Sequence, residues 1–245
     1  MLKYFFAGPI RIPSYAMMII LGGMICNLIA QKSLRKDLKK YREFLLLEVV
    51  GAAGAILGAK AMSLLDNPSV YKFSLEGFKE AGYSYYGGLF GFLLFAIAIC
   101  KTCRIDGITI AKEYIYLLSL MHAFWKVGCF LGGCCFGRPY EGVLAVCYPE
   151  GVNSVSNMKV FPSPLAEAVM SGVITLILLY MKRKKTTWQP IGSYLVLYGL
   201  SRFVLEFCRY HENQSFFSVV HVYSIIAIGI GLFLVIKNNR RLNNE

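Results

Sequence analysis

Seven long apolar segments separate the charged parts of this 245-residue sequence. They fall at roughly 13–31, 43–65, 83–100, 112–134, 164–181, 191–208 and 219–236, and each is near the ~20 residues that an α-helix needs to cross a bilayer. Only 16% of the residues are charged, against about 25% in an ordinary soluble domain. The sequence therefore predicts an all-α integral membrane protein with seven transmembrane helices, built as a single polytopic domain over residues 1–245.

Basic residues are distributed unequally between the connecting segments. The first, third and fifth connections and the C-terminal tail together hold fifteen lysines and arginines, whereas the opposite side holds seven. Because cytoplasmic loops are enriched in Lys and Arg, we expect the C-terminus in the cytoplasm and the N-terminus outside. The long connections at 66–82 and 137–163 are then outer-face loops. We expect the basic residues behind the net charge of +12 to contact anionic lipid head groups of the membrane and not nucleic acid.

The sixth segment carries ionisable residues at helical spacing. In YGLSRFVLEFCR, Tyr198, Arg202, Glu206 and Arg209 follow one another at intervals of four, four and three, which places them on one helix face. Charges inside a bilayer are costly and face the bundle interior or a cavity. Arg202 and Glu206 form either a structural ion pair or part of an anion site. The additional arginine favours an anion such as phosphate.

Two other segments begin with features typical of tight packing or of a binding site. YSYYGGLFGF opens the third segment, and its Gly87 and Gly88 permit either close helix packing or the approach of the backbone and Tyr86 to a lipid head group. FPSPLAEAV opens the fifth segment. There Glu167 suits the positive end of the helix dipole, and we expect this structural role for it.

The stretch KVGCFLGGCCFGRP holds three of the eight cysteines. The intervals of five and one between Cys129, Cys134 and Cys135 match none of the usual zinc patterns, so we expect no metal, and no cofactor. Three interpretations of these cysteines stay open. They are apolar filler, a catalytic or acyl-carrying thiol, or partners of Cys147 in a disulfide on the oxidising outer face.

Six stretches, the four quoted above and two earlier ones, resemble motifs of the bacterial prolipoprotein diacylglyceryl transferase family and occur in the same order along the chain. IPSYAMMIILG resembles its first-helix motif, with Tyr15 as the tyrosine, and GAILGAKAMSLLDN resembles the second, with Lys60 where arginine is usual. SYYGGLFGF resembles its His-Gly-Gly motif, and FPSPLAEA its Pro-Ser-Gln-Leu-Tyr-Glu element. WKVGCFLGGCCFGRP resembles the signature Gly-Arg-x-Gly-Asn-Phe-x-Asn-Gly-Glu-x-x-Gly, and YGLSRFVLEFCR the late Tyr-x-x-x-Arg…Glu-x-x-Arg helix.

The resemblance implies transfer of a diacylglyceryl group from phosphatidylglycerol to the thiol of a prolipoprotein lipobox cysteine, or to another thiol, in the bacterial cytoplasmic membrane. It implies four catalytic residues: Tyr86, Lys126, Arg202 and Glu206. The substrate-binding residues that it implies are Tyr15, Lys60, Gly87, Gly88, Cys129, Cys134, Gly137, Tyr198 and Arg209.

The sequence departs from the family pattern at the centre of the site. Tyr86 replaces a histidine and Lys126 an essential arginine, while Cys129 and Cys134 replace an asparagine and the glutamate of the signature. His221, near the start of the seventh segment, is an alternative to Tyr86 as the substitute for the histidine. A second function therefore stays open, that of a non-catalytic or thiol/redox membrane protein which keeps the fold and a phospholipid-binding pocket.

Overall fold

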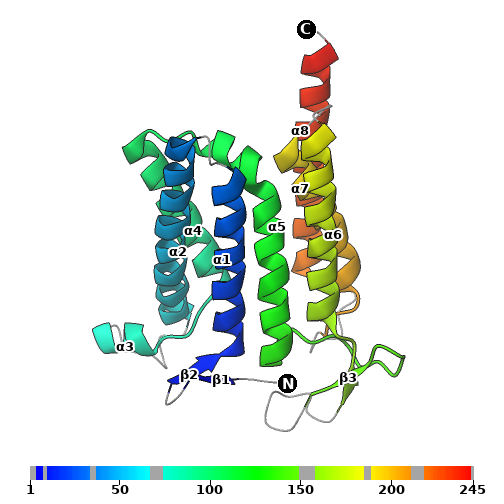
Figure 1. The fold of residues 1–245 in the computed structure, drawn as a ribbon. Helices are drawn as coiled ribbons and strands as arrows, with labels where there is room; N and C mark the ends of the chain where they lie inside the picture. The colour runs from blue at the N-terminus through cyan, green and yellow to red at the C-terminus, as the bar shows by residue number, and fades with distance from the viewer. Residues whose placement is uncertain are drawn as a thin grey trace. The chain divides into compact units, whose positions relative to one another are not determined.

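The computed structural model describes residues 4–7, 10–33, 37–66, 74–148, 158–184, 189–210 and 218–243. Long α-helices make up most of this structure, and one such helix coincides with each predicted segment (Figure 1). These helices are α1 (Ser14–Ser33), α2 (Leu38–Asp66), α4 (Tyr85–Cys103), α5 (Gly107–Gly132), α6 (Ser163–Lys184), α7 (Pro190–Glu206) and α8 (Val219–Asn243). The predicted loops add the short helix α3 (Leu75–Glu80) and the antiparallel pair β3 (Val146–Cys147) and β4 (Lys159–Val160). A second antiparallel pair, β1 (Tyr4–Ala7) and β2 (Ile10–Pro13), precedes α1.

Five of the described helices are long and apolar enough to cross a bilayer, namely α1, α2, α5, α6 and α8. Helix α4 contains a shorter apolar stretch, Gly87–Cys103, and α7 has 17 residues. The exposed large side chains on these helices are mainly Leu, Ile, Val and Phe. Helices satisfy their own backbone hydrogen bonds and can therefore face lipid with such a surface. The chain is a helical integral membrane protein.

Several helix ends differ from the predicted segments. For example, α6 extends beyond 164–181 at both ends, whereas α5 stops before 134 and α7 before 208. At α5 the cause is Gly133, whose φ of 74° suits glycine and ends the helix. The N–H groups of Gly133 and Cys134 donate to the carbonyl oxygens of Phe130 and Cys129, at 3.2 and 3.0 Å. These two hydrogen bonds form a Schellman motif.

The chain divides into two compact units, one of Met1–Leu28 and Lys112–Glu245, and the other of Ile29–Ala111. In the second unit α2 packs along α4 through glycines. A Cβ atom on Gly58 would overlap the carbonyl oxygen of Gly87, and one on Gly91 would overlap that of Gly54. The packing role considered for the glycines of the third segment is therefore present.

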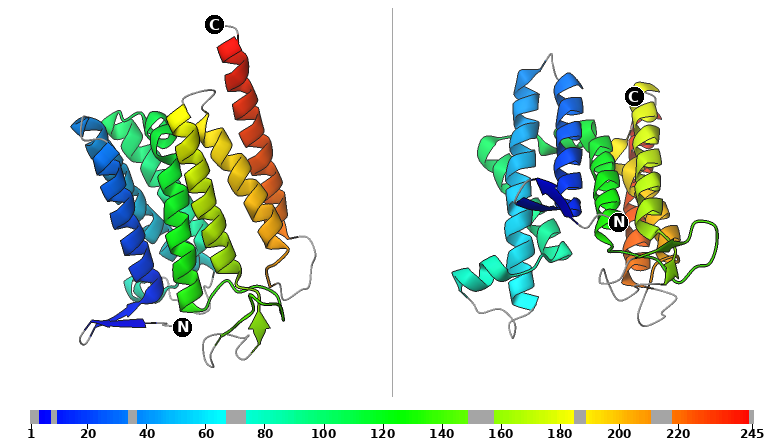
Figure 2. Two further views of the ribbon diagram at one scale, coloured as in Figure 1. Left: turned by 45° about the vertical axis from the view of Figure 1, so that its right-hand side comes forward. Right: turned by 60° about the horizontal axis from the view of Figure 1, so that its bottom comes forward.

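In the first unit, α5, α6, α7 and α8 run beside one another (Figure 2). Glycines again set the α7–α8 distance, since a Cβ atom on Gly192 would lie 2.8 Å from the carbonyl oxygen of Gly231. The loop from α5 to α6 has a small core of its own, formed by Tyr148 and Val160 with Phe136 packed against them. This loop holds the end of α5 close to the start of α6 and to the end of α7.

Candidate functional site

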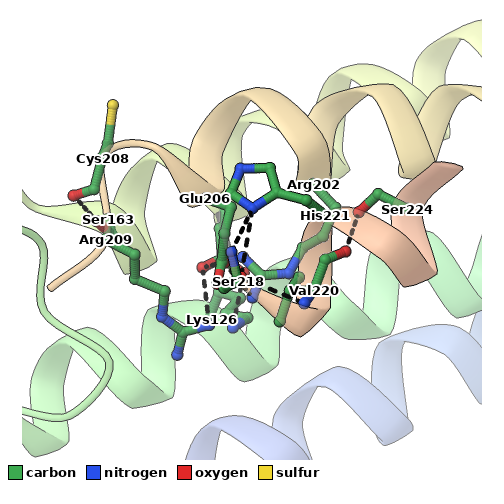
Figure 3. A network of polar contacts seen from close by, with 11 residues as sticks. Lys126, Ser163, Arg202, Glu206, Cys208, Arg209, Ser218, Val220, His221 and Ser224 are labelled. Carbon is green, nitrogen blue, oxygen red and sulfur yellow. Dashed lines mark hydrogen bonds and ion pairs between the residues drawn. The ribbon is translucent and has the colours of Figure 1, made fainter. Parts of the chain in front are cut away.

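A network of buried charges joins α5, α6 and α7 (Figure 3). Glu167, one turn into α6 and 3% exposed, is its central residue. One carboxylate oxygen lies 2.7 Å from the ammonium nitrogen of Lys126. The other lies 3.3 Å from a guanidinium nitrogen of Arg202 and 4.0 Å from one of Arg209. Glu167 therefore interacts with three cations, which come from three different parts of the chain.

A second carboxylate extends the network toward α8. Glu206 lies 3.0 Å from Arg202, one turn further along α7. It accepts a hydrogen bond of 2.8 Å from the hydroxyl group of Ser218, whose backbone N–H donates to Nδ1 of His221 at 3.0 Å. Arg202 is thus held between two carboxylates. His221, which is fully buried, orders the start of α8 beside Glu206.

The network contains more positive than negative charge. Lys126, Arg202 and Arg209 contribute three cations, and Glu167 and Glu206 contribute two carboxylates. An uncompensated charge in apolar surroundings is costly, so these five residues together favour a bound anion. The side chain of Arg209 is 22% exposed, whereas the other four are 13% exposed or less. Arg209 is therefore the cation most accessible to a ligand.

The polar stripe predicted in the sixth segment is present in part. Arg202 and Glu206 pair along α7 as their spacing predicts. Arg209 does not continue the helix face, because α7 ends at Glu206 and Arg209 forms an isolated β-bridge with Gly137. It nevertheless reaches Glu167. The structural ion pair and the anion site proposed as alternatives thus occur in one network.

Gly137 permits the close backbone packing that positions Arg209. Its N–H donates to the carbonyl oxygen of Phe161 at 2.9 Å. A Cβ atom at this position would lie 2.5 Å from that oxygen, 2.6 Å from the hydroxyl oxygen of Ser163 and 2.7 Å from the carbonyl oxygen of Cys208. Any side chain here would push apart the loop, the start of α6 and the turn after α7.

Two predicted tyrosines make ring contacts with α5. The ring of Tyr198 lies edge-on to that of His122, with centroids 5.4 Å apart, and the ring of Tyr15 lies edge-on to that of Trp125 at 6.0 Å. His122 in turn lies 2.8 Å from the hydroxyl group of Ser171. The backbone of Tyr15 also lies close to α5, since a Cβ atom on Gly128 would be 3.2 Å from the Cα atom of Tyr15. Both tyrosines therefore belong to the unit that contains the charge network.

The three cysteines at the end of α5 converge. The sulfur atoms of Cys129, Cys134 and Cys135 lie within 4.8 Å of one another. All eight cysteines lie in the described residues and are free, so Cys147 forms no disulfide with Cys134 or Cys135. Hydrogen bonds to the other two thiols, together with the positive charges of Arg209 and Lys126, hold the pKa of the Cys135 thiol well below its usual value. Of the three interpretations of these cysteines, the structure excludes the disulfide with Cys147.

Lys60 belongs to the second unit and has a different environment. Its ammonium group donates to three backbone carbonyl oxygens at the end of α3, those of Phe78, Lys79 and Ala81, at 3.3, 2.8 and 3.0 Å. It also lies 5.0 Å from the ring centroid of Tyr83. Cations stabilise the last carbonyl groups of a helix. Lys60 therefore fixes α3 against α2.

The other predicted residues of the third segment lie at the start of α4. Gly87 contacts α2 so closely that a Cβ atom on it would overlap the carbonyl oxygen of Gly58, whereas the nearest atom to a Cβ on Gly88 would be 3.5 Å away. Tyr86 lies in the first turn of α4, and its side chain falls outside the described part of the structure. Gly87 is thus a packing residue, and Gly88 leaves room for a small side chain.

The family model for prolipoprotein diacylglyceryl transferases matches residues 3–237. The chain belongs to this family. It is 26% identical over 235 residues to the phosphatidylglycerol–prolipoprotein diacylglyceryl transferase of Clostridium tetani, covering 92% of each chain. The protein of the same name from Bordetella bronchiseptica is 26% identical to this chain over 219 residues, which cover 84% of this chain and 81% of the relative. The one from Rickettsia bellii is also 26% identical, over 256 residues that cover 97% of this chain and 95% of the relative.

Two stretches that resemble motifs of the diacylglyceryl transferase family supply the cations of the charge network. The stretch resembling the family signature covers the end of α5 and the loop after it, where it supplies Lys126, the three converging cysteines and Gly137. The stretch resembling the late arginine–glutamate helix covers the second half of α7 and the turn after it, and it supplies Arg202 and Arg209. Elements separated by some 70 residues in the sequence thus contribute to one charge network.

The dipole role predicted for Glu167 was too narrow, because its carboxylate is the centre of the network. A usable signal was present in the sequence. FPSPLAEA resembles a family element that ends in glutamate, and three cations in apolar segments require more counter-charge than Glu206 alone provides. Contacts between distant helices were needed to show which carboxylate supplies it.

Proposed function

We propose that this protein transfers the diacylglyceryl group of phosphatidylglycerol to the thiol of a lipobox cysteine in prolipoproteins, and that the charge network binds the lipid phosphate. The observation that carries the proposal is the excess of cations over carboxylates in a largely buried site. The family and the names of the relatives support the choice of donor and acceptor.

The chemistry requires stabilisation of a phosphate leaving group. The acceptor sulfur forms a bond to the terminal glyceryl carbon, and the bond between that carbon and the phosphate oxygen breaks. Glycerol phosphate leaves with the bonding electrons, and the thiol proton is taken up by the phosphate product. Because negative charge grows on the departing phosphate, preorganised cations lower the barrier most effectively there.

The residues of the network have different roles in this proposal. Arg209 binds the phosphate directly, because it is the most exposed cation and its contact with Glu167 is the longest. Arg202 and Lys126 supply the remaining positive charge, and Glu167 and Glu206 hold them in position. A guanidinium group can donate two hydrogen bonds to one phosphate.

The family resemblance assigns further residues to the transfer. Tyr86 is a hydrogen-bond donor in place of the family's histidine, and His221 is its alternative. Tyr15 and Tyr198 contact the lipid. Lys60 is left out of the binding site, since three backbone carbonyls already accept hydrogen bonds from its ammonium group.

We also propose a seven-span topology with an outer N-terminus, a cytoplasmic C-terminus and a location in the bacterial cytoplasmic membrane. The excess of basic residues on alternate connections supports this orientation. The match of the family model over residues 3–237 supports treating 1–245 as one polytopic domain. The segments at 66–82 and 137–163 are then outer-face loops, and the network lies near the second of them.

The transfer can be tested with purified protein in lipid nanodiscs that contain phosphatidylglycerol. After incubation with a lipobox peptide, mass spectrometry should show a diacylglyceryl addition on the peptide and an equal amount of glycerol phosphate. Arg209→Ala should lower the initial rate by about 100-fold. Arg138→Ala, which removes an exposed arginine of the same loop, should leave it unchanged. Phosphatidylglycerol binding without any addition to the peptide would favour the non-catalytic lipid-binding protein.

A further inference from the structure

Three sulfur atoms lie at the end of α5 without a role in the transfer just described. Those of Cys129, Cys134 and Cys135 lie within 4.8 Å of one another, and no second group of three potential metal ligands occurs in the described ranges. Lys126 lies one turn before Cys129 on α5, so the sulfur atoms adjoin the charge network. Three converging thiols next to a group of cations form a potential binding site for a ligand.

The local backbone explains how cysteines at such unusual intervals meet. In a Schellman motif the side chains of residues five apart, on either side of the helix end, come together. Cys129 and Cys134 occupy these two positions around Gly133, and the Cys134 thiol lies 3.5 Å from the carbonyl oxygen of Cys129. The usual zinc spacings, from which no metal was expected, do not include cysteines that a turn at a helix end brings together.

Cys135 is held in a strained conformation. Its φ is 59°, in the left-handed region that is unfavourable for a residue with a Cβ atom. Strain of this kind persists where the surroundings enforce it, and it concentrates at functional sites. Here the strained residue contributes the third sulfur of the cluster.

The distances and charges suit a thiophilic metal ion. A tetrahedral zinc ion with bonds of about 2.3 Å to sulfur places its sulfur ligands about 3.8 Å apart. Sulfur atoms within 4.8 Å of one another reach this arrangement by movements of about 1 Å or less. Three thiolates give a zinc site a net negative charge, which suits a position next to Lys126, one turn before Cys129 on α5.

A buried tyrosine lies beside the cluster, since the ring of Tyr148 packs against those of Phe130 and Phe136, which flank the cysteines in the sequence. Tyr148 is fully buried, and its hydroxyl group has no hydrogen-bond partner among the described residues. It interacts electrostatically with all three cysteines. Donors around a metal site orient its ligands and tune their charge.

We propose that Cys129, Cys134 and Cys135 bind a zinc ion as thiolates, and that its fourth coordination position receives the thiol of the acceptor cysteine. The burial of the ligands supports an open side, since Cys129 is buried, Cys135 half-buried and Cys134 exposed. Catalytic zinc sites keep three protein ligands and one open position. The second half of the proposal rests on the proposed transfer.

A zinc ion at this place supplies the nucleophile. A thiol that binds zinc is deprotonated, and its proton passes to water. The thiolate sulfur then forms the bond to the glyceryl carbon, the carbon–oxygen bond breaks, and the phosphate oxygen takes the electron pair and later a proton from water. Zinc stays divalent throughout, so no oxidant or reductant is needed.

Metal binding can be measured without any activity. Protein in detergent, equilibrated with Zn²⁺ and desalted, should retain one zinc per chain by elemental analysis, and Cd²⁺ should produce the ultraviolet charge-transfer band of cadmium thiolates. Cys129→Ser, Cys134→Ser and Cys135→Ser should each weaken binding by about tenfold or more. Cys147→Ser, which removes an exposed thiol outside the cluster, should bind like the parent.

A measurement on the unmutated protein covers the case in which the serine variants fail to fold. X-ray absorption at the zinc edge should show at least three sulfur ligands at about 2.3 Å. Zinc that is absent, bound without sulfur, or bound equally by all four serine variants would overturn the metal site.

Transfer activity separates this proposal from the function on which it rests. Chelator-treated protein should lose transfer to the lipobox peptide and regain it with Zn²⁺. Full transfer by zinc-free protein would overturn the role of the metal while the transferase function stands. Zinc bound by three cysteines in a protein that transfers nothing would confirm the metal site and refute the proposed transfer.

Discussion

Lys60 and Lys126 are both lysines inside helices of an apolar chain, yet their surroundings satisfy them in different ways. Lys60 is half-exposed and donates to three backbone carbonyl oxygens at the end of α3. Lys126 is 9% exposed and shares Glu167 with two arginines. The carbonyl groups at the end of α3 accept the hydrogen bonds of the Lys60 ammonium group, and this contact stabilises only that turn. A carboxylate shared by three cations leaves positive charge available to a ligand.

Glu167→Gln should have the largest effect, because among the described residues this carboxylate alone pairs with all three cations. Loss of one partner from a buried ion pair costs several kcal/mol, and the cations would no longer be held in position. We expect transfer to fall by at least about 100-fold in the mass-spectrometric assay. Glu141→Gln, at an exposed loop carboxylate, is the matched control and should leave the rate unchanged. A Glu167→Gln rate close to that of the parent would remove the distinction between the two lysines.

The two lysines can be compared directly with the same substitution. Lys126→Met should lower transfer by about 100-fold, since it removes a cation of the network. Lys60→Met should leave the rate per folded molecule nearly unchanged and lower the unfolding temperature by about 2–4 °C, because it removes hydrogen bonds to α3. Initial rates and thermal unfolding in detergent would be measured on both variants. Equal losses of rate would place both lysines in the site.

Glycines provide a similar contrast between the two units. Gly137→Ala should lower both the unfolding temperature and the transfer rate, because the added Cβ atom displaces the backbone beside Arg209. Gly87→Ala should lower the unfolding temperature with a smaller effect on the rate per folded molecule, since it separates α2 from α4. A loss of rate with Gly87→Ala as large as with Gly137→Ala would favour the head-group role first considered for the glycine pair.

The smallest effect is expected from Gly88→Ala. The nearest atom to the new Cβ would be 3.5 Å away, which is ordinary contact, and alanine favours the helix over glycine by about 1 kcal/mol. The unfolding temperature should stay the same or rise slightly, as thermal unfolding beside Gly87→Ala would show. A clear loss of stability would mean that α4 packs more tightly than these contacts indicate.

The sequence predicted features that depend on local spacing. Hydropathy located the long helices, because a bilayer requires about 20 apolar residues in a row. The interval of four predicted the contact between Arg202 and Glu206, which lie one turn apart on α7. Features that depend on contacts between distant segments were not predicted. Glu167 pairs with cations that are 35 residues or more away in the sequence. Lys60 donates to carbonyl groups of α3, a short helix in a segment that was predicted to be a loop.

The converging cysteines lie between these two cases. Their intervals matched no familiar metal pattern, yet a glycine directly before Cys134 is the local signal for a helix end that turns back on itself. With that turn recognised, Cys129 and Cys134 become neighbours from the sequence alone. The strained backbone of Cys135 was not foreseeable, because it is an exception to the usual preference of such residues.

The charge network centred on Glu167 is, in our proposal, what makes this protein a working diacylglyceryl transferase. The most direct measurement is growth of bacterial cells depleted of their own transferase and supplied with this protein, its Glu167→Gln variant or its Glu141→Gln variant, with membrane levels checked for each. The account predicts growth with the parent and with Glu141→Gln, and none with Glu167→Gln. Equal growth with all three, or no growth with a parent protein that is present in the membrane, would contradict it.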